Sequence, residues 1–267
     1  MHSTLRPAGE LLREWRLRRR LSQLDLACDA GISSRHLSFL ETGRARPSRE
    51  MILRLAEHLD VPLRARNTLL MAAGFAPIYP ERPLSDPALS AARRAVDLVL
   101  AGHEPYPALA VDRHWTLVAA NRAVQPLLAG VASALLEPPV NVLRLTLHPD
   151  GLAGRIANPG EWRAHLLHRL QRQVDVSGDA GLADLLEELR GYPVPATAGE
   201  ETLFDPDAFV VPFRLRTGAG TLSFFSTTTV FGTPVDITLS ELALETFFPA
   251  DAETAQACRR LLEAAAG

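Results

Sequence analysis

SQLDLACDAGISSRHLSFLETG, residues 22–43, is the stretch of sequence that decides the fold around it. Ser22 and Ser33 each precede a helix-forming run, and a serine in that position accepts a hydrogen bond from a backbone N–H of the first turn. Gly31 suits the left-handed turn that ends the first helix, and Ala27 is small where the two helices would cross. Three apolar residues would seat the second helix in a core: Ile32, Leu37 and Leu40. This spacing predicts a helix-turn-helix.

The second helix of the pair would turn one side toward solvent, because its leucines point inward. Four residues form that outer side: Ser34, Arg35, Ser38 and Phe39. In helix-turn-helix proteins, the outer side near the N-terminus of this helix enters the DNA major groove. We therefore predict that this helix reads base edges.

The segment resembles the XRE/Cro-repressor family of helix-turn-helix regulators, and the likeness runs over residues 7–71. It rests on the Ser-Gln start, the small residue, the turn glycine and the Glu-x-Gly ending. The resemblance implies that Gln23 and the loop 43–48 hold phosphates, while the outer side of the second helix faces bases. The expected DNA contacts are Gln23, Ser33, Ser34, Arg35, Ser38, Phe39, Arg44, Arg46 and Ser48.

Phe39 departs from the polar residue that is more usual in this family. It either meets a thymine methyl group or packs against a neighbouring subunit. A helical bundle with an incidental turn is the alternative that involves no DNA.

The charge of the chain is distributed unevenly, although the net value is only −3. All 28 basic residues are Arg. Residues 1–82 hold 14 Arg against 9 Asp and Glu, a net of +5, and the rest of the chain holds 14 against 22, a net of −8. A basic first part on an acidic second part indicates that one end of the chain meets a polyanion.

Composition limits the class of protein. A chain of 267 residues with 47% apolar and 22% charged residues suits two globular domains. Its apolar runs are shorter than the ~18 residues of a membrane span, and the Arg-rich start does not resemble a secretory signal. Cys28 and Cys258 suggest neither a disulfide framework nor a metal pair. We expect a cytoplasmic protein without a membrane contact.

The order of the pieces predicts an all-α domain over 1–75, a proline-rich semi-rigid linker over 76–90 and a second domain over 91–267. In the second domain, ALAVD and WTLVAA are typical of strands, and Asn121 would cap the helix that follows. Residues 208–231, with a Gly-Ala-Gly turn at 218–220, predict a β-hairpin. A final helix is expected from about Ala252 to Ala266.

Residues 108–125 resemble the opening of a PAS-type sensor. The whole order, ending in FGTPVDITLSELALETFFPADAETA at 231–255, resembles the MmyB-like transcription regulators. The resemblance implies a lambda-repressor-like helical domain followed by an α/β PAS-like domain with an antiparallel sheet. It also implies an apolar cavity, for which a fatty acid or a similar molecule is the expected ligand.

Candidate ligand contacts follow from that resemblance. Apolar candidates on the expected strands and covering helix are Trp115, Leu166, Leu170, Phe209, Phe213 and Phe224. An acyl carboxylate would favour the planar fork of an arginine. Arg122, next to Asn121 at the mouth of the first helix, is the first choice for this anchor, and Arg214 is another candidate.

Catalytic and metal-binding motifs are absent from the sequence. His165 and His168 lie three residues apart on one expected helix, without a third ligand, and no phosphate-binding or dinucleotide fingerprint occurs. We therefore expect no enzyme, no metal and no cofactor. Because one helix-turn-helix reads about half a site, a homodimer is expected. Two alternatives are that the second domain serves only dimerisation or protein partners, and that the chain is an antitoxin.

Overall fold

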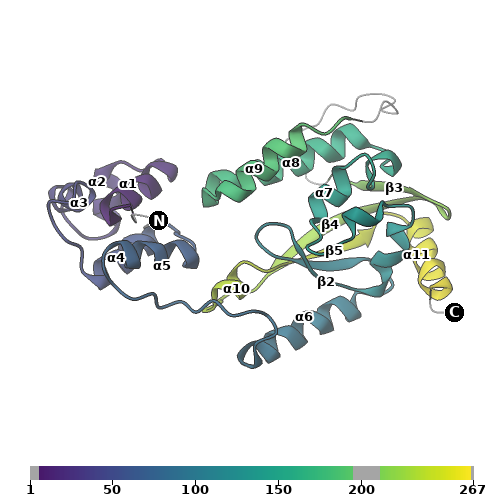
Figure 1. Cartoon of the computed structure of the whole chain (residues 1–267), viewed down its shortest axis with the longest axis horizontal. Helices are drawn as coiled ribbons and strands as arrows, with labels where there is room; N and C mark the ends of the chain where they lie inside the picture. The colour runs from purple at the N-terminus through teal and green to yellow at the C-terminus, as the bar shows by residue number, and fades with distance from the viewer. Residues whose placement is uncertain (1–5, 195–210, 266–267) are drawn as a thin grey trace. The chain divides into compact units, whose positions relative to one another are not determined.

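The computed structural model describes residues 6–194 and 211–265 (Figure 1). The chain divides into two compact units. The first, which we call the head, contains the chain up to Arg82 together with Pro234–Ser240. The second, the body, contains Pro83–Thr233 and the chain from Glu241 onward. This division differs from the expected linker at 76–90, because residues up to Arg82 belong to the head and because a segment from late in the sequence joins it.

The head is helical. Its helices among the described residues are α1 (Ala8–Arg18), α2 (Gln23–Asp29), α3 (Ser34–Glu41), α4 (Arg49–His58), α5 (Leu63–Ala72) and the short α10 (Ile237–Ser240). Both expected caps are confirmed. Ser22 Oγ accepts from the backbone N–H of Asp25 at 3.1 Å while the Asp25 carboxylate accepts from Ser22 N at 3.0 Å, and Ser33 Oγ accepts from His36 N at 3.1 Å. Gly31 makes the predicted turn with φ +63°.

Close packing fixes α3 against α1. Leu37 and Leu40 are 0% and 1% exposed. A side chain at Gly9 of α1 would place its Cβ 2.2 Å from the carbonyl oxygen of Leu40, so only glycine permits this approach. The core therefore sets the position of α3 and leaves its other side to solvent.

Residues 76–82 pack on the head through specific hydrogen bonds. The buried Asn67 of α5 accepts from the backbone N–H groups of Ile78 and Tyr79, at 3.0 and 3.1 Å, and donates to the Tyr79 carbonyl at 2.7 Å. Arg64 forms a bidentate pair with Glu81. These contacts hold a stretch that composition alone described as a spacer.

The body contains an antiparallel sheet with the strand order β2-β1-β5-β4-β3. The strands are β1 (Ala108–Val111), β2 (Leu117–Ala120), β3 (Phe213–Thr217), β4 (Gly220–Val230) and β5 (Ala243–Pro249). The predicted hairpin is confirmed over 213–230, with Thr217 opposite Gly220; residues 208–210 of the expected first strand lie outside the described residues. The fold class predicted from the sequence, a helical first domain and an α/β second domain with an antiparallel sheet, is confirmed.

Helices cover both faces of the sheet (Figure 1). The body helices are α6 (Ser90–Gly102), α7 (Val142–Leu147), α8 (Pro159–Ser177), α9 (Ala180–Arg190) and α11 (Ala252–Ala264), with short 3-10 turns η1 (Pro87–Leu89), η2 (Arg122–Leu128), η3 (Ser133–Leu135) and η4 (Ala153–Arg155). Alternation along β1 separates two cores. Ala108 and Ala110 pack with α6, whereas Leu109 and Val111 face the core that includes α7, α8 and α9. Among the described residues, no helix combines the length and the apolar character that a bilayer span requires.

Candidate functional site

The outer side of α3 is arranged as predicted. Ser34 and Arg35 are exposed, and Ser38 and Phe39 are half-buried at the margin of the helix. The guanidinium carbon of Arg35 lies 5.4 Å from the centre of the Phe39 ring, which is a cation–π distance. A stacked guanidinium samples fewer orientations than a free one. Phe39 is thus placed to orient Arg35, a role that differs from both sequence-based interpretations of this residue.

The loop after α3 carries the expected phosphate-contacting residues. Gly43 has φ +72°, and Arg44, Arg46 and Ser48 are exposed. Ser48 Oγ caps α4 by accepting from Met51 N at 3.2 Å. Ser33 caps α3 in the same way, and a hydroxyl that accepts in a cap can still donate its own hydrogen. Both caps therefore keep the capacity to donate to a phosphate.

Gln23 is held in a buried polar network. Arg16 donates from Nε and Nη2 to the two carboxylate oxygens of Glu41, at 2.6 and 2.9 Å, and both side chains are almost fully buried. Gln23 Nε2 donates to Glu41 Oε2 at 2.7 Å. One N–H of the Gln23 amide is thus committed to Glu41, and only the other could donate to a phosphate. The network joins α1, the start of α2 and the end of α3.

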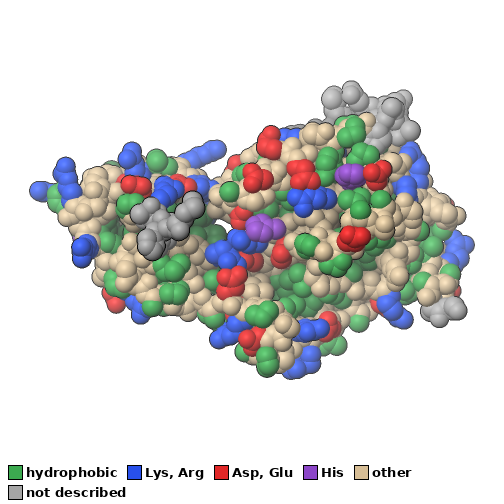
Figure 2. All heavy atoms as spheres, in the orientation of Figure 1, with side chains coloured by type: hydrophobic (Ala, Val, Ile, Leu, Met, Phe, Trp, Pro, Cys, Tyr) green, Lys and Arg blue, Asp and Glu red, His purple; other side chains and the backbone are tan. Residues whose placement is uncertain are grey.

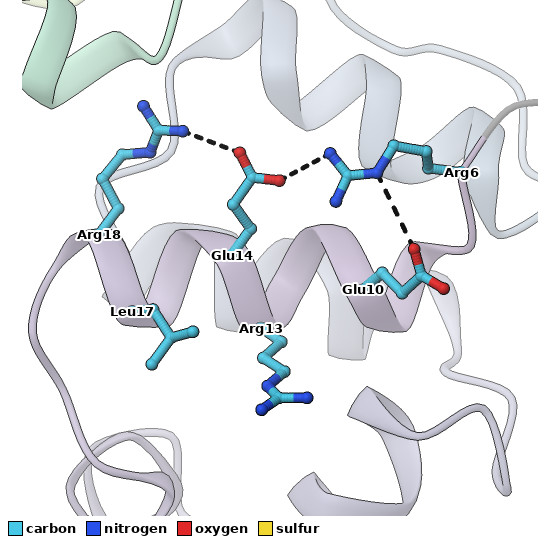
Figure 3. A pocket seen from close by; sticks show the side chains of 6 residues that line it. All are labelled: Arg6, Glu10, Arg13, Glu14, Leu17 and Arg18. Atoms are coloured by element: carbon cyan, nitrogen blue, oxygen red, sulfur yellow. Dashed lines mark hydrogen bonds and ion pairs between the residues drawn. The ribbon is translucent and has the colours of Figure 1, made fainter.

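A second charged cluster lies in the head, around a shallow pocket along α1 (Figure 3). Glu14 accepts from Arg6 at 2.7 Å and from Arg18 at 2.8 Å, whereas Arg13 and Leu17 point to the other side of the helix (Figure 3). Partial burial alone would raise the pKa of Glu14, but the hydrogen bonds from the two arginines hold it below the usual value. Because these arginines already pair with carboxylates, we assign this cluster to stabilising α1.

Arginine side chains project from the head, and on the visible face of the body apolar side chains lie between charged ones (Figure 2).

The body encloses a cavity of about 90 Å³ on the α7–α8 side of its sheet. The sheet contributes Leu109, Leu117, Phe213, Leu215, Phe224 and Phe247. The other walls are Pro107, Val124, Leu127, Leu128, Val142, Leu145, Thr146, Leu152 and Trp162. Among the described residues, no charged side chain belongs to this lining.

Two of the apolar residues predicted to contact a ligand, Phe213 and Phe224, lie in the cavity wall. Trp115, Leu166 and Leu170 are buried in the same core without lining the cavity. Phe209 lies outside the described residues.

The polar residues predicted for the ligand lie elsewhere. Arg122 has 72% of its side chain exposed and pairs with Glu104, with Nη2 to Oε2 at 2.6 Å. Arg214 is exposed on β3. Asn121 makes no cap hydrogen bond; its side chain accepts from Ala108 N at 3.1 Å and donates to the Leu100 and Tyr106 carbonyls at 3.1 and 2.8 Å. Asn121 thus joins the end of α6 to β1, and Arg122 is exposed and does not line the cavity.

Sequence reasoning missed Trp162, the lining residue of α8. Its indole Nε1 is buried, and no partner is found for it among the described residues. The ring stacks on His165 at 5.3 Å and lies 4.9 Å from the Phe213 ring, centre to centre. Burial lowers the pKa of His165, and the nearby Arg169 and His168 lower it further, so the imidazole beside Trp162 is neutral at pH 7. Within the part of the chain that the structure describes, no group of His, Cys, Asp or Glu is suited to hold a metal ion.

Comparison with known families agrees with this division of roles. Residues 8–69 match a helix-turn-helix domain family. Residues 92–261, more than half of the chain, match the family described as the MmyB-like transcription regulator ligand binding domain. Both are domain families of regulators rather than of enzymes. Comparison with curated proteins finds no match. The α3 face and the hollow body thus lie in the domains that bind DNA and ligand, and the chain belongs to the family of MmyB-like transcription regulators.

Proposed function

We propose that the protein is a sequence-specific DNA-binding transcription regulator whose body senses an apolar small molecule, such as a fatty acid. The observation that carries the proposal is the uncharged cavity of the body in a chain whose head exposes Arg35 and Ser34 on α3. Each methylene that leaves water contributes about 0.8 kcal/mol to binding, so an alkyl chain suits this wall. We propose that the protein works in the cytoplasm, where DNA and metabolites are both accessible.

The cavity must enlarge to hold such a ligand. Its 90 Å³ is far below the roughly 300–1,000 Å³ of pockets for drug-sized ligands. The wall opposite the sheet is built partly from η2 and α7, which are only seven and six residues long, and η2 contains Pro126. We infer that these short elements move when a ligand enters. A ligand that binds the enlarged form better shifts the population toward it, and regulation requires this difference in affinity.

The experiment is native mass spectrometry of the purified full chain, followed by thermal melting with saturated fatty acids of increasing length. We expect a retained small molecule, or a rise in melting temperature up to a limiting length. Val124→Phe, which fills the cavity from η2, should shorten that limit. Val118→Phe, the same change at a β2 position that is 40% exposed and outside the lining, should not.

If no member of the panel changes the melting temperature or the affinity for promoter DNA, the sensing role is lost. The body would then serve as a dimerisation or protein-partner platform. Salt-dependent binding to promoter DNA tests the other half of the proposal, because phosphate contacts release counterions and weaken as salt rises.

We further propose a homodimer joined through the body. Two helix-turn-helix units can then reach half-sites about 34 Å apart. The acidic body would not compete with the basic head for DNA, and α6 exposes Leu98 (73%) and Val99 (44%) as an apolar contact. Sedimentation should give a dimer at micromolar concentration that Leu98→Glu weakens more than Arg94→Glu, an exposed site on the same helix. A monomer with and without DNA would overturn this proposal.

A further inference from the structure

Trp162 is an exception among the buried polar groups of the body. Its side chain is 4% exposed and lines the cavity, yet its indole N–H has no acceptor among the described residues. A buried donor without an acceptor destabilises a folded protein, because it has lost its hydrogen bond to water. Such a group calls for an explanation, and an acceptor atom on a bound ligand is one.

Trp115, in the same core, shows what the chain does when a tryptophan is purely structural. Trp115 Nε1 donates to Gln173 Oε1 at 2.7 Å. Trp115 does not line the cavity. Among the described residues, the tryptophan that packs away from the cavity thus has an acceptor, and the tryptophan in the cavity wall has none.

The surroundings of Trp162 determine which acceptor fits. Thr146, the other described lining side chain with a polar atom, donates its hydroxyl to the Val142 carbonyl at 2.7 Å and can offer a ligand only lone pairs. Arg169, close to the neutral His165, is bound to the Glu245 carboxylate at 2.6 and 3.0 Å. A carboxylate at Trp162 would be buried beside an arginine, Arg169, that is already paired with Glu245, which is unfavourable. A carbonyl oxygen would not meet this penalty.

We propose that the indole N–H of Trp162 donates a hydrogen bond to the ligand, and that the ligand atom it meets is a neutral acceptor such as the carbonyl of a ketone, an ester or a protonated acid. The proposal rests on the proposed function, since it needs the cavity to bind a ligand. The expected class of ligand is therefore narrower than apolar chains in general. Trp162 would select molecules that carry one neutral oxygen along an alkyl chain.

The test uses two probes of the same shape, octan-2-one and 2-methyloct-1-ene, in which a C=O is exchanged for a C=CH₂. Their affinities are measured on the full chain, on Trp162→Phe and on Trp115→Phe by competition and thermal melting. We expect the ketone-to-alkene affinity ratio to fall about tenfold in Trp162→Phe and to stay unchanged in Trp115→Phe. Equal ratios in all three proteins would overturn the proposal.

Infrared spectroscopy of bound octan-2-one provides a readout that needs no variant to fold. A hydrogen bond from the indole moves the carbonyl stretch to lower frequency than in a hydrocarbon solvent. A stretch at the hydrocarbon position would refute the hydrogen bond while leaving ligand binding intact. If neither probe binds, it is the proposed sensing function that fails, so the two failures are distinguishable.

The segment 234–240 belongs to the head, although in the sequence it lies between β4 and β5 of the body. Its contacts are specific. Ile237 N donates to the Pro80 carbonyl at 2.8 Å, and Thr238 Oγ1 donates to the Arg82 carbonyl at 2.6 Å. The Asp236 side chain, 3% exposed, accepts from Arg82 Nη1 at 3.3 Å. Residues 78 and 79 in turn hydrogen-bond to Asn67 of α5.

The same segment is continuous with the cavity wall. The β4–β5 ladder ends at the pair Val230 and Ala243, and these strands supply Phe224 and Phe247 to the lining. A ligand that displaces either phenylalanine therefore acts on a strand whose chain runs directly into the head. Coupling between sites requires such an element, in which two arrangements differ in their affinity for the ligand.

We infer that residues 234–240 transmit cavity occupancy to the head. Hydrogen exchange of the full chain with and without octan-2-one tests this. We expect altered protection in α5 and residues 78–82 of the wild type, and loss of that response in Asp236→Asn/Thr238→Val, which nearly preserves shape. Val235→Ala, at a position that is 77% exposed in the same segment, should respond as the wild type. An undiminished response of the head in the double variant would overturn the inference. If the probe changes protection nowhere, the sensing function itself fails.

Discussion

The head exposes its candidate functional residues to solvent, whereas the body buries its candidate residues in the core. In the head, Leu37 and Leu40 fill the core while Arg35 and Ser34 project from the other side of α3. In the body, Phe213 and Phe224 are core residues and cavity wall at once, at 6% and 0% exposure. A change at Ser34 or Arg35 on the exposed side of α3 should therefore alter DNA binding without altering the stability of the head. A change in the cavity of the body should alter both ligand binding and the stability of the body.

Two buried polar sites, one in each region, are satisfied to different degrees. Arg16 and Glu41 in the head satisfy each other with two hydrogen bonds. Trp162 in the cavity wall of the body has a buried indole N–H for which the described residues offer no acceptor, and Arg18 Nε in the head is likewise buried without a partner among them. The Arg16–Glu41 pair is thus complete within the protein, whereas the Trp162 N–H is the donor that our proposed ligand would meet.

Glu41→Ala, which removes one partner of the buried pair in the head, should have the largest effect. It leaves the Arg16 guanidinium buried without its carboxylate, and loss of one partner of a buried pair costs about 3–5 kcal/mol. We expect the head to unfold at a much lower denaturant concentration and DNA binding to fail. Glu57→Ala, at an exposed position of α4, is the matched control and should change little. Equal stabilities of the two variants would show that the pair does not hold the head together.

Leu145→Ala tests the cavity of the body, which Leu145 lines. Removing a buried leucine side chain costs about 2–5 kcal/mol and enlarges the cavity. Leu186→Ala makes the same change in the same core without touching the lining. We expect both variants to melt earlier. Only Leu145→Ala should regain more stability from added octan-2-one than the wild type gains, because the enlarged cavity admits the probe without moving its walls. The same gain in both variants would contradict a localised ligand site.

Arg35→Ala should change DNA binding and leave the stability of the head unchanged, because Arg35 is exposed. Loss of a bidentate base contact costs about 1–3 kcal/mol at one base pair, and the melting temperature should not change. Phe39→Leu removes the ring beneath Arg35 and should weaken the preference at that same base pair by a smaller amount. Arg46→Ala should instead weaken all sequences alike and reduce the salt slope by about 1. A preference shifted at a different base pair in Phe39→Leu would remove its positioning role.

The helix-turn-helix was predictable because its signals are local. Ser22, Ser33 and Gly31 act within a few residues of themselves, and the outer side of α3 follows from helical periodicity. The hairpin 213–230 was predictable for the same reason. The residues expected to touch DNA remain predictions, with Gln23 now constrained by its bond to Glu41.

The cavity was only partly predictable, because residues from 107 to 247 meet in its wall through long-range pairing. Strand β5 was not predicted, because it carries Glu245 and a charged residue is not expected in a buried strand position. Glu245 is buried there because it pairs with Arg169 of α8. Asn121 follows the rule for a helix cap, yet its amide bonds to three backbone groups around the turn between α6 and β1. For both Glu245 and Asn121, a partner distant in the sequence determines the role of the residue. A local sequence pattern does not reveal such a partner.

Arg122→Ala should have the smallest effect on ligand binding and on stability. An anchor of the ligand would have to face the cavity, but Arg122 is exposed and bound to Glu104. The hydrogen bond from Arg122 holds the pKa of Glu104 below its usual value, so the pair is formed at neutral pH and weakens as the pH falls toward that pKa. An exposed pair of this kind contributes little to stability. We expect the stabilisation by octan-2-one and by fatty acids at pH 7 to be the same in Arg122→Ala and in the wild type. If the variant loses the response to fatty acids but keeps that to the ketone, the carboxylate is bound at the surface by Arg122, and the body recognises the two ends of such a ligand at separate places.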